Sequence, residues 1–129
     1  MTPTWLNDVV AAFGRQMGLS RFALDGRGVA GVCFENGFAL RFEYAGEALL
    51  VSLGVPAGDD PATLRALLEA AHPAAAARGG VRLRAAYLAR RGEAVYAARL
   101  GARAVTVAAL AEAFASLWQA AERLRRRAS

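Results

Sequence analysis

The chain contains one cysteine, Cys33, and one histidine, His72, the two side chains that most often supply a nucleophile and its base. Cys33 lies between Val32 and Phe34, in an apolar run where a small core residue would be expected. His72 follows Leu68 by four residues, so it lies near the apolar side of an expected helix. We interpret Cys33 as a core residue and His72 as a helix-end residue at an interface. The sequence therefore predicts no catalytic site and no enzymatic activity.

Residues for a cofactor site are also sparse. One cysteine and one histidine are too few for a structural zinc site, and no acidic cluster has the spacing of metal ligands. The stretch Asp25-Gly26-Arg27-Gly28 precedes a strand, so it lacks the helix N-terminus that a phosphate-binding loop provides. Glu35, Glu43 and Glu47 are spaced along strands and a turn, and we expect them on a solvated rim. The sequence predicts no cofactor and no metal.

The net charge of +5 invites a nucleic-acid-binding hypothesis. Every basic residue is arginine, and three of the five net positive charges lie in residues 122–129, which we call the arginine tail. Arg82 and Arg84 alternate with apolar residues, as on the wet face of a half-buried strand. The strands show no alternation of arginine and aromatic residues that would stack bases. We expect a frayed tail and no nucleic-acid partner; a basic nucleic-acid-binding module is the weaker alternative.

The length of 129 residues is that of one ordinary domain, and we expect a single domain over residues 1–129. Charges or glycines interrupt every apolar run before it could span a bilayer. The first residues, Met-Thr-Pro-Thr, lack the basic region of a secretory signal. A single cysteine forms no internal disulfide, which fits a reducing compartment. These features predict a cytoplasmic protein without membrane insertion.

Three stretches have the apolar periodicity of helices. They begin near residues 4, 61 and 107, and the first is expected to end near residue 17. The N-cap candidates are Thr4, Asp60 and Thr106, and the candidate ends are Gly18, Pro73 and Gly79-Gly80. Pro61 suits the first turn of the second helix, directly after Asp60. The apolar stripe of that helix consists of Leu64, Leu67, Leu68 and Ala71.

The pair Asn36-Gly37 is the strongest strand signal, because a type I′ hairpin turn needs a positive φ at both central residues. A two-residue loop there places Cys33 opposite Leu40, with both side chains on the apolar inner face. Strands are expected at residues 29–34, 38–44, 48–55, 81–89 and 94–100. The predicted fold is α+β, with an antiparallel sheet of about five strands and three helices in the order α-β-β-β-α-β-β-α.

The elements have more apolar faces than a domain of this size buries by itself. We therefore expect an apolar surface that packs against another chain, either through self-association or by binding an extended or helical segment.

Two stretches resemble a known family. Residues 13–37, FGRQMGLSRFALDGRGVAGVCFENG, are similar to the N-terminal signature of the class I type III secretion chaperones, the Tir chaperone-like family. The matching positions are Phe13-Gly14, Met17-Gly18-Leu19, Leu24-Asp25, Gly28, Val32, Phe34 and Gly37. Residues 67–85, LLEAAHPAAAARGGVRLRA, resemble the family's second helix, its Gly-Gly break and its fourth strand. The last helix, with Phe114 and Trp118, is also similar.

The resemblance implies a cytosolic homodimer that binds the N-terminal chaperone-binding segment of an effector and keeps it non-globular for secretion. Components of the secretion apparatus are further partners that it implies. It assigns the dimer interface to Leu64, Leu67, Leu68 and Leu83. The candidates for effector contact are Phe13, Met17, Phe22, Phe34, Phe38 and Leu40, each of which is equally suited to the core. The alternative is an adaptor of the same fold that binds a protein partner or a regulator outside secretion.

Overall fold

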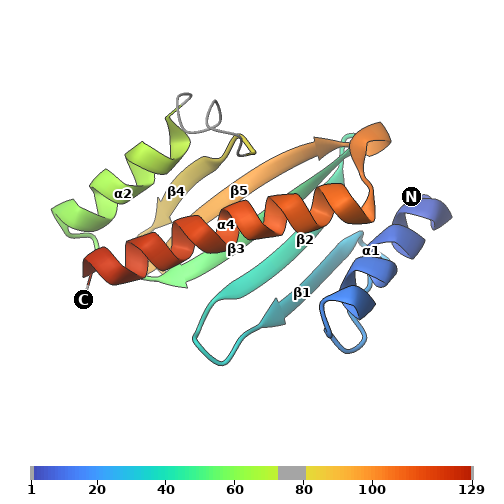
Figure 1. Cartoon of the computed structure of the whole chain (residues 1–129), viewed down its shortest axis with the longest axis horizontal. Helices are drawn as coiled ribbons and strands as arrows, with labels where there is room; N and C mark the ends of the chain where they lie inside the picture. The colour runs from blue at the N-terminus through green and yellow to red at the C-terminus, as the bar shows by residue number, and fades with distance from the viewer. Residues whose placement is uncertain (1, 73–80, 129) are drawn as a thin grey trace.

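The computed structural model describes residues 2–72 and 81–128, so the helix breaks expected at Pro73 and Gly79-Gly80 lie outside the described residues. In chain order the elements are α1 (Thr4–Gln16), β1 (Val29–Cys33), β2 (Ala39–Ala45), β3 (Ala48–Pro56), α2 (Pro61–Ala71), β4 (Arg84–Leu88), β5 (Glu93–Gly101), a short 3₁₀ helix (Ala102–Ala104) and α4 (Val107–Ala128) (Figure 1). The predicted order of three helices and five strands is confirmed.

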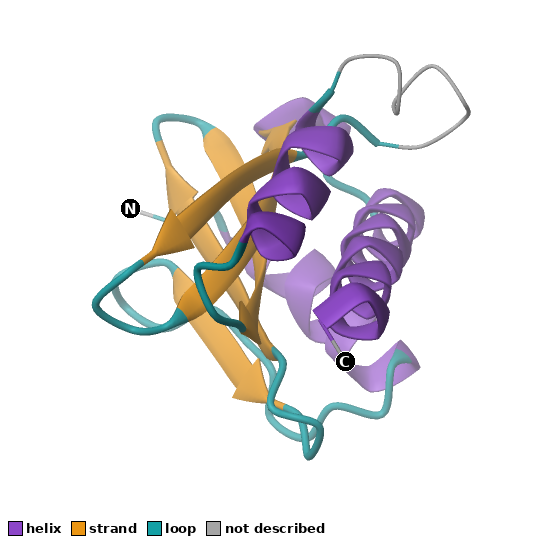
Figure 2. Ribbon diagram, turned by 90° about the vertical axis from the view of Figure 1, so that its left-hand side faces the viewer, coloured by secondary structure: helices purple, strands orange, loops and turns teal. Residues whose placement is uncertain are grey.

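The five strands form one antiparallel sheet in the order β1-β2-β3-β5-β4. The helices lie on the same face of this sheet, as Figure 2 shows from the side. α4 crosses the middle of the sheet and packs on β3 and β5, whereas α2 packs on β4 and on α4. In Figure 1, α1 lies toward the β1 end. The molecule therefore has a covered inner sheet face, and β1 and β4 are its two edge strands.

The core lies between the inner sheet face and α1, α2 and α4. Alternation along β3 turns Leu49, Val51, Leu53 and Val55 inward, where all four are buried. α4 contributes Leu110, Ala113, Leu117, Ala120, Ala121 and Leu124. Phe13 of α1 is completely buried, and its ring contacts those of Phe22, Phe42 and Phe114 at centroid distances of 5.5–6.2 Å. Phe13 thus joins α1, the sheet and α4 in one packed unit.

Most of the predicted helix ends are confirmed. Asp60 Oδ1 accepts a hydrogen bond from the Thr63 N–H at 2.7 Å, and Thr106 Oγ1 accepts one from the Ala109 N–H at 3.0 Å. Gly18 ends α1 with a φ of +72°. The prediction for Thr4 is wrong. Thr4 is the first helical residue, and the N-cap is Pro3, which has no side-chain acceptor.

We expect Asp60→Ala to lower the melting temperature, because the substitution leaves the Thr63 N–H without its acceptor. That N–H holds the pKa of Asp60 below its ordinary value of 3.8. The contribution of Asp60 is therefore complete above pH 3.8 and disappears as the pH falls through the lowered pKa. Thermal unfolding at neutral and acid pH should show the deficit of Asp60→Ala shrinking in acid. Asp60→Asn, which keeps an acceptor without a charge, is the control.

The β1–β2 hairpin differs from the prediction by one residue. Cys33 pairs with Ala39 and Val32 pairs with Leu40, because the loop contains three residues and not two. Of the Asn36-Gly37 pair only Gly37 has a positive φ, at +92°, so the type I′ turn does not form. Instead the Asn36 side chain accepts a hydrogen bond from the Phe38 N–H at 3.0 Å. The shift turns Cys33 outward, and the predicted core position of this residue is wrong.

Residues 122–128 of the arginine tail are helical, contrary to the expected fraying. α4 continues to Ala128, and Leu124 is buried in the core. The Arg125 guanidinium lies 4.4 Å from the centroid of the Phe38 ring, and Arg127 forms an ion pair with Glu69 of α2. The tail therefore joins the end of α4 to the hairpin on one side and to α2 on the other.

Candidate protein-binding surfaces

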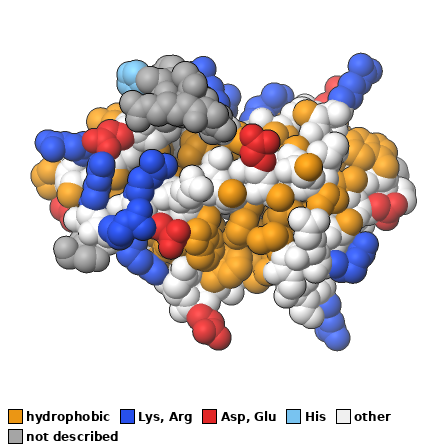
Figure 3. All heavy atoms as spheres, viewed as in Figure 1, with side chains coloured by type: hydrophobic (Ala, Val, Ile, Leu, Met, Phe, Trp, Pro, Cys, Tyr) orange, Lys and Arg blue, Asp and Glu red, His pale blue; other side chains and the backbone are white. Residues whose placement is uncertain are grey.

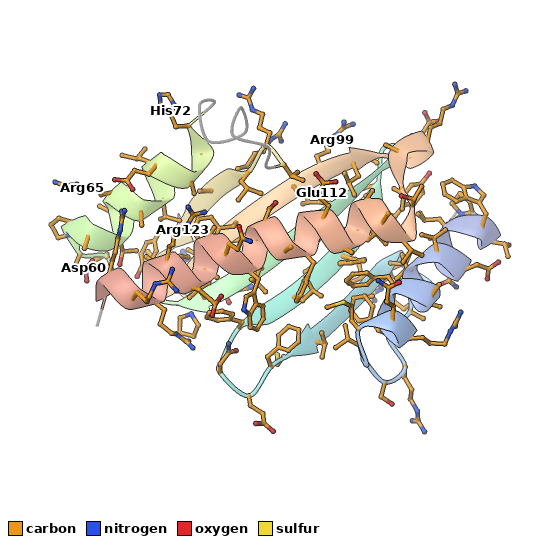
Figure 4. The ribbon with its side chains drawn as sticks, in the orientation of Figure 1. Asp60, Arg65, His72, Arg99, Glu112 and Arg123 are labelled. Carbon is orange, nitrogen blue, oxygen red and sulfur yellow. The ribbon has the colours of Figure 1, made fainter. Side chains whose placement is uncertain are left out.

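Cys33 and His72 lie in separate parts of the fold. Cys33 is exposed on β1. His72 is exposed at the C-terminal end of α2, whereas Asp60 lies at the other end of this helix (Figure 4). α2 packs on β4, which forms the other edge of the sheet from β1. The structure therefore does not bring the cysteine and the histidine together as a catalytic pair.

Sites for small ligands are poorly developed in residues 2–72 and 81–128. Within these ranges no three His, Cys, Asp or Glu side chains lie close enough to hold a metal ion. A hollow of about 230 Å³ on α4 is lined by Gln119, Glu122, Arg123 and Arg126, and it is largely open to solvent. Burial raises the pKa of Tyr96 to about 12, which takes this tyrosine still further from ionising at neutral pH. None of the described helices combines the length and the hydropathy that a bilayer-spanning segment needs.

The six candidates for effector contact fall into two groups. Phe13, Phe22, Phe38 and Leu40 are buried, with at most 6% of each side chain exposed. These four pack inside the protein in this structure. Met17, at the end of α1, is 38% exposed, and Phe34, at the start of the hairpin loop, is half-buried. Only the second group is accessible for contact with another chain.

Phe34 belongs to a cluster of aromatic side chains where α4 packs against the hairpin loop, which we call the aromatic patch; its members are Phe34, Phe38, Phe114 and Trp118. The Trp118 ring lies 4.8 Å from Phe38, 5.2 Å from Phe34 and 5.5 Å from Phe114, measured between centroids. Phe38 lies beneath the others, which are half-buried. Figure 3 shows hydrophobic side chains gathered on this side of α4. The patch therefore presents aromatic surface to solvent on the helical side of the molecule.

The fold explains why Phe114 and Trp118 were not predicted as contact residues. They are four positions apart on α4, next to the buried Leu110 and Leu117, so their spacing indicates an ordinary core stripe. Phe114 contacts Phe13 of α1 and Phe34 of the hairpin, whereas Trp118 contacts Phe34 and Phe38 of the hairpin, and these contacts leave both rings partly exposed. No signal in the sequence places the loop there.

α2 carries a second apolar surface. Leu67 is buried against the rest of the protein, as is Leu83, which precedes β4. Leu64 and Leu68 lie one helical turn apart and are 45% and 75% exposed. The four residues that the resemblance assigned to the dimer interface are thus two core residues and two exposed leucines. A pair of exposed leucines on one helix face is a suitable contact for another protein chain.

Comparison with known proteins gives a consistent result. The model of the Tir chaperone protein (CesT) family matches residues 8–125. The ExsC–ExsE complex contains a chain with a similar fold: the TM-score is 0.76 at 22% identity, covering 95% of this chain and 92% of that one. A chain of the HopA1–SchA chaperone–effector complex has a TM-score of 0.71 at 17% sequence identity, and the match covers 98% of this chain and 99% of that one. The structure of the Yersinia pestis type III secretion chaperone SycH in complex with a fragment of YscM2 gives a TM-score of 0.69 at 16% sequence identity. The match covers 92% of this chain and 98% of that one. No curated protein sequence matches the chain.

Proposed function

Because the chain belongs to the Tir chaperone protein (CesT) family, we propose that it is a cytoplasmic type III secretion chaperone that dimerises and binds the N-terminal segment of a cognate effector. The match to the family model over residues 8–125 carries this proposal. We further propose that residues 1–129 act as one domain without catalytic chemistry. The bound effector segment stays non-globular and ready for secretion.

The geometry supports binding of an unfolded segment. An apolar side chain of a bound segment would cover the exposed edges of Phe34 and Trp118 in the aromatic patch. Met17 at the end of α1 is exposed and suits a further apolar contact. The edge strand β1 has backbone groups that an extended segment can pair with. These features favour a partner that is extended and carries apolar side chains.

The dimer contact is assigned to Leu64 and Leu68 of α2. Two-fold symmetry would bring the α2 helices of both protomers together, so that each leucine pair covers the other. A dimer offers two copies of the aromatic patch to one wrapped effector segment, and the second contact gains from the effective concentration that the first creates.

The proposal is tested by co-expression of the chain with the N-terminal segments of the effectors that the same bacterium secretes. We expect a cognate segment to co-purify as a soluble complex. Equal binding of unrelated segments would contradict the assignment of a cognate effector, and binding of none would contradict the chaperone function.

Phe34→Asp is expected to weaken binding of the cognate segment about tenfold or more, because it places a carboxylate in the aromatic patch where apolar contacts are expected. Leu50→Asp is the matched control, since Leu50 is 37% exposed on the uncovered outer face of the sheet. Isothermal titration calorimetry with each variant measures the affinity, and circular dichroism checks the fold. Equal affinities of the two folded variants would remove the aromatic patch from the binding surface.

A further inference from the structure

The edge strand β1 has an alternating hydrogen-bond pattern. The Tyr44 N–H donates to the Gly28 C=O at 2.8 Å, and the Phe34 N–H donates to the Phe38 C=O at 2.8 Å. Because residues of an antiparallel strand alternate, Ala30 and Val32 also direct their backbone groups toward β2. The backbone groups of the odd-numbered residues 29, 31 and 33 therefore point away from the sheet, where another strand would pair.

Asp25 forms hydrogen bonds to the outward backbone groups of Val29, the first of these three residues. Its Oδ1 accepts a hydrogen bond from the Val29 N–H at 3.0 Å, and its own N–H donates to the Val29 C=O at 2.8 Å. Both outward backbone groups of Val29 are thus satisfied within the chain. The Asp25 carboxylate accepts a further bond from the Arg27 N–H at 2.8 Å. The Val29 and Arg27 amides hold the pKa of Asp25 below its ordinary value of 3.8, because both hydrogen bonds favour the ionised carboxylate.

The other two outward positions are open. Within the described part of the chain, neither Gly31 nor Cys33 makes a backbone hydrogen bond on its outer side. Both residues are exposed, and the nearest atom to a Cβ built on Gly31 is the Leu40 carbonyl oxygen of β2, at 3.5 Å. The space beside these two residues is free for a backbone to approach.

We infer that Asp25 restricts strand addition at β1 to Gly31 and Cys33, and that it thereby fixes the register in which an effector segment pairs with the sheet. This inference rests on the proposed chaperone function. A segment that extended past Gly31 would compete with Asp25 for the Val29 backbone groups. The paired stretch is consequently short, and its end is set by the carboxylate of Asp25 together with the backbone N–H of the same residue.

The same geometry specifies the segment that fits. Its backbone groups pair with those of Gly31 and Cys33, so its alternate side chains lie on the inner and outer sides of the sheet. On the inner side they adjoin Val32 and Phe34, which are half-buried, so apolar side chains are favoured there. The occupant is thus an extended segment that places apolar residues on one side only.

Hydrogen exchange in the wild-type protein shows directly which β1 amides a bound segment covers. The probe is the N-terminal effector segment that passes the co-expression test. We expect this segment to slow exchange of the Gly31 and Cys33 amides about tenfold or more, while the Val29 amide, already bonded to Asp25, changes little. A bound segment that leaves the Gly31 and Cys33 amides unprotected would overturn this inference but not the proposed function. If no segment co-purifies, the proposed function fails and the inference fails with it.

The role of Asp25 is tested with cross-links, because Cys33 is the only cysteine in the chain. Single cysteines are placed one by one along the effector segment, and disulfide formation with Cys33 identifies the segment position beside it. The wild-type protein should select one position. Asp25→Ala frees the Val29 N–H, although the backbone N–H of residue 25 still donates to the Val29 C=O. This variant should therefore also accept a register shifted by two residues, in which the segment accepts the Val29 N–H and slows its exchange.

Asp25→Asn is the control for this substitution, since it keeps an oxygen that can accept the Val29 N–H. It should retain the wild-type cross-link. A single unchanged cross-link position in folded Asp25→Ala would show that Asp25 does not set the register. Should Asp25→Ala fail to fold, several equivalent cross-link positions in the wild-type protein or in Asp25→Asn would also overturn the inference.

Discussion

Phe13→Ala is expected to lower the free energy of unfolding by about 3–5 kcal/mol, the range measured when a fully buried aromatic residue is truncated. The Phe13 ring contacts aromatic rings from three different parts of the fold, namely Phe22, Phe42 and Phe114. None of these can close the cavity without leaving its own contacts. Because a whole domain is stabilised by about 5–15 kcal/mol, this single change removes a large part of the total.

Urea unfolding followed by circular dichroism measures this loss, at one fixed protein concentration because the proposed dimerisation would contribute to stability. Met17→Ala is the control on the same stretch of chain, since Met17 is 38% exposed, and we expect a change of less than about 1 kcal/mol. Similar losses for the two variants would contradict the central position of Phe13 in the core.

The double substitution Leu64→Glu with Leu68→Glu is expected to convert the proposed dimer into a folded monomer. Both leucines are exposed in the protomer, so the charges have little effect on its fold. In a two-fold interface the four carboxylates would be buried without partners, and each unpaired buried charge costs about 3–5 kcal/mol. The dimer dissociation constant should therefore rise by about a thousandfold or more.

Light scattering reads this result as a fall in molar mass from twice 13.6 kDa to 13.6 kDa. Trp5→Glu is the matched control, because Trp5 of α1 has the same 45% exposure as Leu64 but lies on a different helix. A wild-type protein that is monomeric, or a double variant that stays dimeric, would exclude α2 as the interface.

The helix ends were predictable because they depend on a few neighbouring residues. Asp60 and Thr106 each need only an N–H three residues further along the chain, and Gly18 needs only its own freedom at positive φ. The prediction for Thr4 failed for a local reason too. The helix begins at Thr4 itself, one residue earlier than a Thr4 cap requires, so the Thr4 hydroxyl is not in the capping position.

The hairpin register was not predictable from Asn36-Gly37, because the same pair suits a two-residue and a three-residue loop. The choice depends on whether Asn36 adopts a positive φ or uses its side chain to accept the Phe38 N–H, and the second occurs. The position of Phe38 beneath Trp118 and Arg125 agrees with that outcome. The one-residue difference between the predicted and the observed register is thus accompanied by contacts between residues that are far apart in the sequence.

In the candidate binding surfaces, too, some features were predictable from the sequence and others were not. Periodicity identified Leu64, Leu67 and Leu68 as apolar members of α2, but adjacent positions 67 and 68 differ from 6% to 75% in exposure. Which side of a wide apolar stripe faces the core is decided by where α4 and β4 lie. Likewise, Phe34 and Phe38 are partners across the hairpin, and Phe38 is the more buried of the two rings because Trp118 and Arg125 both lie against it.

The strand order has a consequence for the time course of folding. β1, β2 and β3 form a meander of neighbours, and β4 and β5 form a hairpin, so each set closes through short loops. The pairing of β3 with β5 joins residues as distant as Ala48 and Gly101, and α4 packs across these two strands. On the ribosome the part of the meander face that α4 covers must therefore stay exposed until β5 and then α4 have emerged. We expect folding to be limited by this late central pairing, and nascent chains that stop before Gly101 to be prone to aggregation.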